Sequence, residues 1–194
     1  APVERPSYAQ YSAGFSKSTA DPILKDAIRY ASKNSSFIRL RSYGTPSVEP
    51  YSVSTKLLNV VDGLAWNRSG QALTYTITVE EAGAYALALK VLNTKTDYTI
   101  FRSIAIDGEI PFEEAKALLI PYTNGNWDVV TPADAQGEPY RFYLSEGTHT
   151  ITLMAQVEPI AEQLIVMRNL IAHINAFALD IRKITGREIG RAHV

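Results

Sequence analysis

The chain has 194 residues, enough for one domain with a sizeable core, and 46% of them are hydrophobic while 20% are charged. The 19 Lys and Arg residues nearly balance the 20 Asp and Glu residues, so no net positive field is present to attract nucleic acid or an anionic membrane surface. Cysteine is absent, which excludes disulfides, thiolate catalysis and cysteine-ligated metal centres, and no apolar run is long enough to predict a membrane span.

The beginning of the chain carries two signals. Residues 1–21 are expected to form a lead or linker, and because they contain neither an initiator Met nor a signal-peptide core, we expect the natural protein to start upstream. Apolar residues at helical spacing then follow Asp21-Pro22 and are typical of a capped helix: Ile23, Leu24, Ala27, Ile28 and Ala31. Whether residues 22–34 form a helix or a strand stays open at this point.

The clearest strand runs from Gln71 to Val79, where apolar residues alternate with Thr at the period of a half-buried strand. Residues 80–83 supply a turn, and apolar residues alternate again over residues 85–91. A tight connection between two such runs predicts an antiparallel hairpin.

Further strands are expected later in the chain. Residues 100–106 alternate and end at Asp107-Gly108, a strong turn dipeptide, while residues 140–144 and 150–155 flank a turn as a second hairpin. Because no helical pattern separates these strands, residues 22–157 are predicted to form an all-β domain. An antiparallel β-sandwich or jelly roll is favoured over a parallel α/β sheet.

The period of the pattern changes after Pro159. Apolar residues recur at steps of four and three from Ile160 to Ile181, and Gly186 suits the residue after a helix end. Residues 158–186 are therefore predicted to form one long C-terminal amphipathic helix. Residues 187–194 are interpreted as a non-native tail, because their peptide corresponds to the translation of a common sequencing adapter, which would make the chain a metagenomic fragment.

Several motifs, taken in order, are similar to one family of domains. They are the run Leu58-Asn59-Val60-Val61-Asp62-Gly63-Leu64-Ala65-Trp66, the run Val79-Glu80-Glu81-Ala82-Gly83-Ala84-Tyr85, an Arg-to-Pro-Phe-x-Glu signature over residues 102–114, and the hairpin of residues 139–150. From Phe37 to Gly186 the chain resembles the galactose-binding-like domains in the large extracellular solute-binding proteins of Gram-positive sugar ABC transporters.

This resemblance implies a jelly roll like that of carbohydrate-binding module families six and thirty-five, in an extracellular lipoprotein at the cell surface. It also implies an adjoining solute-binding domain in the same chain, without direct membrane insertion. Related modules often open with a Glu-Ala-Glu-like strand that helps to hold a structural calcium ion, whereas this chain reads Lys25-Asp26-Ala27-Ile28-Arg29-Tyr30. The departure argues against calcium, and no other cofactor or metal is expected.

Two loops carry the residue types that bind sugars, an aromatic ring to stack on a pyranose and polar groups to reach its hydroxyls. The first-choice site lies within residues 122–128 and comprises Tyr122, Asn124, Asn126 and Trp127, unless Trp127 only plugs the end of the sandwich. The second comprises Trp66, Asn67 and Arg102. There the competing interpretation is stronger: Trp66 packs on the core, and Arg102 forms an ion pair with Asp107 or Glu113.

Signals for catalysis or metal binding are weak. The adjacent acids at residues 80–81 and 113–114 point apart, so they cannot straddle a glycosidic bond, and His149 and His173 have no second ligand at metal spacing. No nucleophile, phosphate or dinucleotide motif is present. We therefore expect a non-catalytic protein.

The leading hypothesis is a carbohydrate-binding module that gathers glycans near a sugar importer. The main alternative is a structural spacer or docking domain without a ligand, whose helix packs on the adjoining domain. A glycosidase accessory domain or a small hydrolase is a third interpretation.

Overall fold

The computed structural model describes residues 4–95, 100–156, 167 and 170–177. The chain divides into two compact units, Ala1–Val157 and Glu158–Val194. In the described part of the first unit, every strand pairs with its neighbours in antiparallel fashion.

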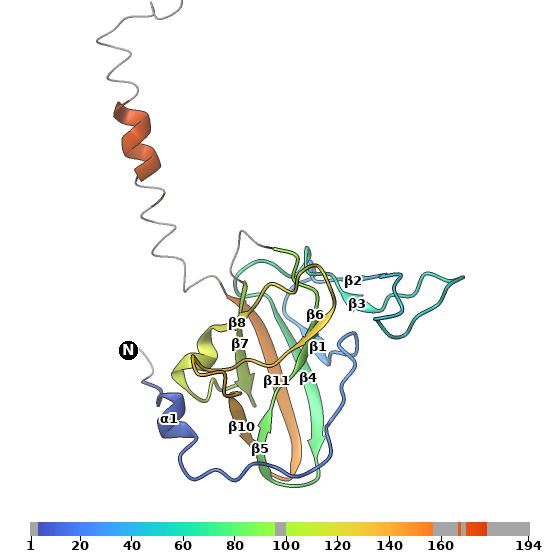
Figure 1. The fold of residues 1–194 in the computed structure, drawn as a ribbon, viewed down its shortest axis with the longest axis vertical. Coiled ribbons are helices and arrows are strands. Elements are labelled where there is room, and N and C mark those ends of the chain that lie inside the picture. The colour runs from blue at the N-terminus through green and yellow to red at the C-terminus, as the bar shows by residue number, and fades with distance from the viewer. Residues whose placement is uncertain (1–3, 96–99, 157–166, 168–169, 178–194) are drawn as a thin grey trace, which may run out of the picture. The chain divides into compact units, whose positions relative to one another are not determined.

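A five-stranded sheet forms the larger layer of the first unit (Figure 1). Its order is β1 (Ser32–Lys33), β4 (Ala72–Val79), β11 (Gly147–Gln156), β7 (Ile100–Ile106) and β8 (Leu118–Ile120). The two longest strands, β4 and β11, are the ones that the alternating pattern marks most clearly.

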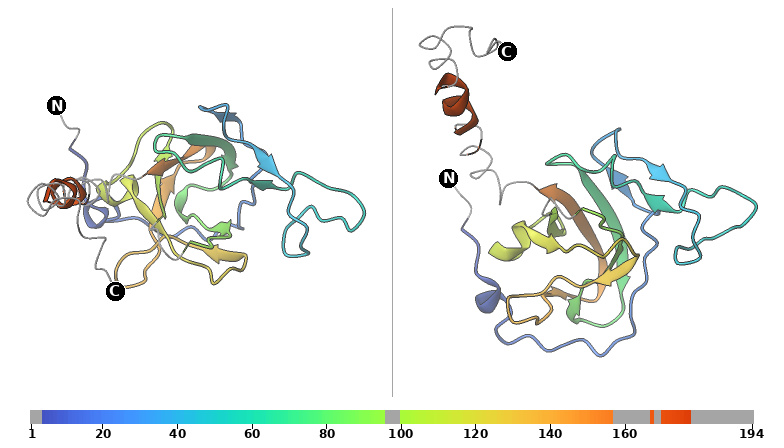
Figure 2. Two further views of the ribbon diagram at one scale, coloured as in Figure 1. Left: turned by 90° about the horizontal axis from the view of Figure 1, so that it is seen from above. Right: turned by 45° about the horizontal axis from the view of Figure 1, so that its top comes forward.

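Three short antiparallel pairs complete the fold. They are β5 (Gly83–Ala86) with β10 (Arg141–Leu144), β6 (Leu89–Val91) with β9 (Asp128–Val130), and β2 (Leu40–Arg41) with β3 (Val60–Val61). The loop between β2 and β3 extends away from the five-stranded sheet, as two further views show (Figure 2). Two short helices, α1 (Tyr8–Tyr11) and the 3-10 helix η1 (Glu113–Lys116), lie in the same unit.

One hydrophobic core joins the five-stranded sheet to the second layer, to which the β5–β10 pair belongs. The five-stranded sheet contributes Leu73, Ile104, Leu118 and Leu153, and β10 contributes Phe142. Phe112, which is fully buried just before η1, belongs to the same cluster, and burying a side chain of this size contributes about 1.5–3 kcal/mol. Strands of both layers thus share a core, as in a β-sandwich, and the predicted all-β antiparallel class is confirmed.

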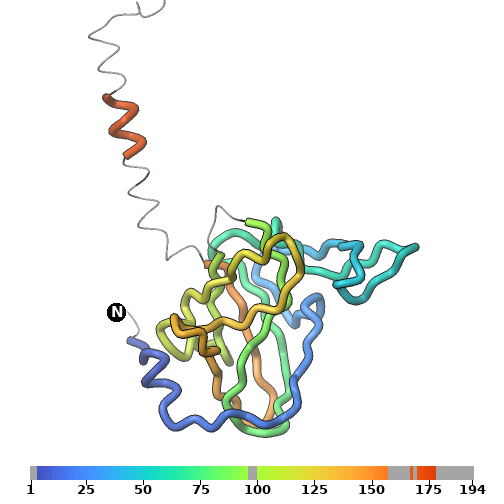
Figure 3. Tube along the Cα trace, viewed as in Figure 1, coloured from blue at the N-terminus to red at the C-terminus, as the bar shows by residue number. Residues whose placement is uncertain are grey.

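Both predicted hairpins are wrong in their pairing, although their strands exist. After β4 the chain turns into β5, but β4 pairs with β1 and β11 whereas β5 pairs with β10. After β10 the chain turns into β11, which again lies in the other sheet. The two tight turns, between β4 and β5 and between β10 and β11, therefore connect the layers of the sandwich rather than neighbouring strands of one sheet. The course of the chain through both turns can be followed in Figure 3.

For the segment before β2, where the sequence left helix or strand open over residues 22–34, the structure shows a short strand and no helix. Residues 22–31 form no helix, and the segment instead ends in the two-residue strand β1, which pairs with β4. Leu24 is 91% exposed, so the apolar spacing has no buried face to stabilise a helix. Earlier in the chain, within the expected lead of residues 1–21, Tyr8 and Tyr11 of α1 pack against the core.

Of the predicted long helix over residues 158–186, only Met167 and residues 170–177 are described as helical, and the long helix is not supported beyond that stretch. The other residues of this prediction, and the tail of residues 187–194, lie outside the described residues. Within the described part of the chain, no helix has the length and apolar character needed to cross a membrane.

Candidate functional site

The strand register brings both predicted sugar-binding loops to the same end of the five-stranded sheet. Ile100, the first residue of β7, lies opposite Ile120, the last residue of β8, and Ala72 at the start of β4 lies opposite Met154 near the end of β11. The segment that enters β4 and the segment that leaves β8 therefore lie at the same end of the sheet, with β11 and β7 between them. We call residues 64–71, 92–95 and 121–127 the loop end.

Asn93 and Thr123, both buried, hold the first-choice loop in place. The Asn93 side chain donates hydrogen bonds to the carbonyls of Ile120 and Pro121 at 3.1 and 3.0 Å. The Thr123 hydroxyl accepts the Asn93 N–H at 3.0 Å and donates to the Asn126 carbonyl at 2.7 Å. Satisfied buried polar groups of this kind rigidify a loop, because breaking any one leaves a buried partner unpaired.

The tip of this loop is a tight turn that projects polar groups outward. Asn124 and Gly125 both have positive φ, +52° and +73°, and the Asn126 N–H donates to the Thr123 carbonyl at 2.9 Å. Two consecutive residues with positive φ are typical of a type I′ turn, which favours Asn-Gly. Asn124 and Asn126 are exposed, and Tyr122 on the near side is 45% exposed.

Trp127 lies at the base of this turn and is partly buried. Its indole Nε1 is shielded from solvent, and no protein atom accepts its hydrogen; among the described residues no other buried side-chain nitrogen or oxygen lacks a partner. An unpaired buried donor costs about 1–3 kcal/mol. This residue is therefore neither a fully satisfied core side chain nor a freely exposed one.

The ring of Tyr43, a residue that sequence reasoning missed, contacts Trp127. The two ring centroids are 5.3 Å apart and the planes are nearly perpendicular, at 84°. Tyr43 follows β2, far from Trp127 in the sequence, so no local pattern could join the two. The only related signal in the sequence was the motif of residues 58–66, which contains Asn59. Asn59 lies directly before β3 and hydrogen-bonds to the backbone of Tyr43.

Asn59 is buried and fixes the backbone of Tyr43. Its Oδ1 accepts the Tyr43 N–H at 2.8 Å, and its Nδ2 donates to the carbonyls of Tyr43 and Pro50 at 3.0 and 2.9 Å. The side-chain amide thus pairs the backbone N–H and carbonyl of Tyr43 as a neighbouring strand would. Its bond to the Pro50 carbonyl fixes the loop that follows Tyr43.

In the second predicted site, of Trp66, Asn67 and Arg102, the side chains of Trp66 and Arg102 interact with other parts of the protein. The Trp66 Nε1–H donates to the Gln71 carbonyl at 2.9 Å, and the Arg102 guanidinium lies 4.4 Å from the Trp66 ring centroid. Gln71 is buried, and its Oε1 accepts the N–H groups of Asn67 and Arg68 at 3.0 and 2.9 Å. Asn67 is exposed, so its side chain is the part of this stretch that faces solvent.

The expected ion pair between Arg102 and Asp107 or Glu113 is not formed. Arg102 donates instead to the carbonyls of Trp66 and Phe101, at 3.0 and 2.9 Å, and burial lowers its pKa to about 10. Arg102 lies near the start of β7 and Asp107 follows its end, about 16 Å away along an extended strand. Glu113 pairs with Lys116.

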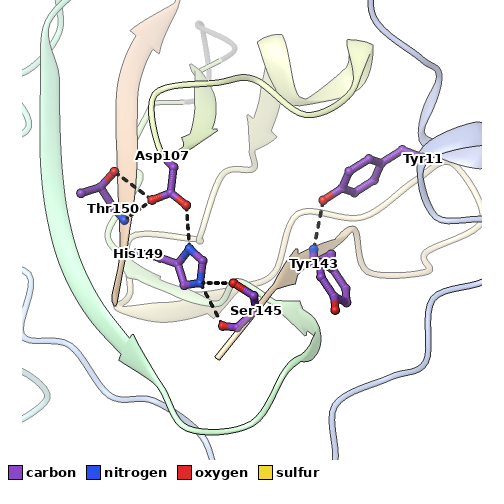
Figure 4. A network of polar contacts seen from close by, with 6 residues as sticks. All are labelled: Tyr11, Asp107, Tyr143, Ser145, His149 and Thr150. Atoms are coloured by element: carbon purple, nitrogen blue, oxygen red, sulfur yellow. Dashed lines mark hydrogen bonds and ion pairs between the residues drawn. The ribbon is translucent and has the colours of Figure 1, made fainter. Parts of the chain in front are cut away.

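At the opposite end of the sheet, Asp107, His149 and Ser145 lie in a row (Figure 4). His149 Nδ1 lies 2.6 Å from Asp107 Oδ2, and Nε2 lies 2.9 Å from the Ser145 carbonyl and 3.2 Å from its Oγ. Where Nδ1 donates to the Asp107 carboxylate and Nε2 donates to the Ser145 carbonyl, the imidazole carries both protons. In that form Nε2 has no lone pair to take a proton from the Ser145 hydroxyl, as a catalytic triad would require.

The pKa values agree with a charged pair. The hydrogen bond to Asp107, followed by the smaller effect of the Ser145 carbonyl, raises the pKa of His149 above 6.5 against the opposing effect of burial. Desolvation alone would raise the pKa of Asp107, but the hydrogen bonds from Thr150 and His149 together lower it below 3.8. Across the described residues, no three His, Asp or Glu side chains cluster as metal ligands would.

Comparisons with known proteins find likeness in structure alone, since no family model and no curated protein matches the chain. A family 35 carbohydrate-binding module from Clostridium thermocellum aligns with a TM-score of 0.51 and 16% sequence identity, over 71% of this chain and 88% of the module. A cycloisomaltooligosaccharide glucanotransferase from Paenibacillus sp. aligns with a TM-score of 0.48 and 24% identity over 67% of this chain, which spans only 15% of that enzyme. A family 35 module from Cellvibrio japonicus gives a TM-score of 0.40, with 18% identity over 60% of this chain and 74% of the module.

The chain therefore shares the antiparallel β fold of the family 35 carbohydrate-binding module from Clostridium thermocellum. The expected kinship with solute-binding proteins of sugar importers finds no counterpart in these comparisons and stays a prediction.

Proposed function

We propose that the first unit is a non-catalytic carbohydrate-binding module that binds its glycan at the loop end. The observation that carries the proposal is Trp127, a partly buried aromatic residue whose shielded indole N–H has no protein acceptor, and which directly follows an exposed turn with Tyr122, Asn124 and Asn126. Aromatic rings next to several amides are the groups that recognise a pyranose ring with its hydroxyls. The fold, shared with a family 35 module, supports the same conclusion.

Within this site, Trp127 and the turn of residues 122–126 are the primary contacts. Asn67 is the member of the second stretch whose side chain remains available. Trp66 and Arg102 support the loop end from behind, because their polar groups are already engaged by carbonyls. Asn93 and Thr123 keep the turn preorganised, so less conformational entropy is lost when a ligand binds.

The wider context that we propose rests on the sequence resemblance. The module would belong to an extracellular, surface-anchored solute-binding protein, where it gathers glycans for a sugar importer next to the domain that delivers them. The full-length gene tests this context directly, since a downstream solute-binding sequence is expected and a glycosidase sequence would indicate an accessory domain of an enzyme instead.

A second candidate function, a spacer or docking domain, is favoured by one observation. In the described part of the second unit, the apolar residues Met167, Leu170, Ile171, Ile174 and Phe177 are each more than half exposed. Apolar side chains gathered on a helix in this way are usually covered by a partner surface. The two functions are compatible, because the docking residues and the glycan site belong to different units.

A glycan array followed by calorimetric titration tests the proposed function. The wild-type protein is expected to bind at least one glycan, and Trp127→Ala is expected to weaken that binding by more than about tenfold. Tyr143→Ala is the matched control, because Tyr143 is a 46% exposed aromatic residue on β10, which belongs to a different sheet. A wild-type protein that binds no glycan, or equal losses in the two variants, would contradict the proposal.

A further inference from the structure

An aromatic pair at the loop end is formed by Trp127 of the loop end and by Tyr43, which lies outside it. Trp127 belongs to the segment that leads into β9, and Tyr43 to the segment that follows β2, yet their rings contact each other at 5.3 Å. Both residues are partly buried, so neither is fully enclosed in the core. Nearly perpendicular planes, at 84°, make the two rings adjacent walls instead of one continuous stacking surface.

The position of Tyr43 is enforced by the fold. The buried side-chain amide of Asn59 makes its hydrogen bonds to the backbone of Tyr43 and Pro50, at 2.8–3.0 Å. A buried amide is costly unless each of its groups is paired, so displacing Tyr43 would leave Asn59 unsatisfied. Tyr43 is thus held more firmly than an ordinary residue of a protruding loop.

The indole N–H of Trp127 marks the same place. It is buried without an acceptor in the protein, and the Tyr43 ring is its aromatic neighbour. An unpaired buried donor is unusual in a native protein, so its occurrence beside Tyr43 points to a functional role rather than to ordinary core packing. A preorganised corner of two rings costs little conformational entropy on binding, because an aromatic side chain has only two rotatable bonds.

We propose that Tyr43 is a second ligand-contacting residue, that Asn59 is the residue that positions it, and that a pyranose binds in the corner between the Tyr43 and Trp127 rings. This inference rests on the proposed function, since it names how the same loop end takes its sugar. It adds a residue from the β2–β3 segment to a site whose primary contacts lie between β8 and β9.

Four variants of the full chain test the inference, titrated with the glycan that the wild-type protein binds best on the array. Tyr43→Ala is expected to weaken binding about tenfold, and Tyr43→Phe, which keeps the ring, is expected to stay within about twofold. Asn59→Ala is expected to weaken binding by about three- to tenfold and to shift the tryptophan emission of the free protein, because the Tyr43 ring no longer holds its place beside Trp127. Tyr51→Ala, on the same protruding loop and 40% exposed, is the matched control and is expected to bind like the wild type.

The outcomes separate this inference from the proposed function. If the wild type binds and Trp127→Ala does not, but Tyr43→Ala keeps the wild-type affinity, the inferred role of Tyr43 is wrong while the proposed carbohydrate-binding function is retained. If the wild type binds no glycan, both fall. Thermal unfolding of each variant is followed alongside, and should Asn59→Ala fail to fold, the contrast between Tyr43→Ala and Tyr43→Phe still decides the matter.

Discussion

The hydroxyl of Tyr11 accepts the backbone N–H of Tyr143 at 3.0 Å, so that a side chain of α1 replaces a neighbouring strand along one edge of β10 (Figure 4). Tyr8, one turn earlier, accepts the N–H of Arg141 in the same way, also at 3.0 Å. Residues 141 and 143 point their N–H groups to the same edge because backbone groups alternate along a strand. The edge of β10 that faces away from β5 is thereby protected.

The first prediction concerns these two hydroxyls. Tyr8→Phe is expected to lower the free energy of unfolding by about 1–2 kcal/mol, because the Arg141 N–H is partly buried and loses its acceptor. Tyr11→Phe is expected to cost less, about 0.5–1 kcal/mol, because the Tyr143 N–H is exposed and water can replace the hydroxyl. Urea unfolding measures both values, with Tyr51→Phe as the control. Equal stability of all three variants would show that the hydroxyls do not protect this edge.

The second prediction concerns the pair of His149 and Asp107. Because the folded pKa of His149 is raised above 6.5, its contribution to stability is complete below pH 6.5 and is lost as the pH rises through the folded value. Because the pKa of Asp107 is lowered below 3.8, its contribution is present above pH 3.8 and is lost as the pH falls through the folded value. The pair is therefore expected to stabilise the fold most between pH 3.8 and 6.5.

Thermal unfolding from pH 3 to pH 9 checks this window. The variant His149→Gln keeps hydrogen-bonding groups but carries no charge, so the difference in melting temperature from the wild type should be largest inside the window and should shrink at both ends. A difference that does not change with pH would mean that His149 acts only by its shape.

The third prediction concerns Gly83, where the first residue of β5 meets the N-terminal segment. A Cβ at this position would lie 2.9 Å from the Cβ and 3.0 Å from the Cα of Ser18. The Ala84 N–H donates to the Ser16 carbonyl at 3.1 Å, and the Ser18 N–H to the Ala84 carbonyl at 3.2 Å, so the segment cannot withdraw without breaking these bonds.

Gly83→Ala is therefore expected to lower the free energy of unfolding by about 1–3 kcal/mol. Gly63→Ala is the matched control, since a Cβ there meets no atom within 4 Å, and it should change stability by less than about 0.5 kcal/mol. Denaturant unfolding of both variants compares them directly, and faster amide exchange at residue 84 in Gly83→Ala alone would identify the N-terminal segment as the part that yields. Similar losses in the two variants would argue against the close contact.

The fourth prediction separates the shape of the loop tip from its chemistry. Asn124 has φ of +52°, a conformation that costs about 1 kcal/mol for Ala but nothing for Gly. Asn124→Gly should therefore preserve the melting temperature and weaken glycan binding about three- to tenfold through the lost amide. Asn124→Ala should lose both stability and affinity. If Asn124→Gly binds the glycan as the wild type does, this amide makes no contact with the ligand.

How much the sequence could predict is seen in particular elements. The alternation over residues 71–79 and 100–106 locates β4 and β7, and the turn dipeptide Asp107-Gly108 does adopt positive φ at both residues. The partners of the strands could not be predicted in the same way. Alternation states which face of a strand is buried, and a tight turn suits a step between layers as well as a hairpin.

The same division runs through the candidate site. Residue type alone placed Trp66 and Trp127 in loops rich in Gly and Asn, and in this the two residues were equivalent. The sequence ranked Trp127 above Trp66 only because Trp66 directly precedes a core strand. The tertiary structure adds the physical difference, because it supplies the Gln71 carbonyl to one indole N–H and no acceptor to the other.

By itself, the amino-acid sequence determined the all-β class, the strands with the strongest alternation and the loops that carry aromatic and amide groups, because these depend on periods and compositions that lie within short stretches of chain. The tertiary structure alone decided which strands are neighbours, that Arg102 covers Trp66 rather than pairing with a carboxylate, and that Tyr43 meets Trp127. Those relationships join residues far apart in the sequence, and they follow from how the two layers close over a shared core, which no local pattern records.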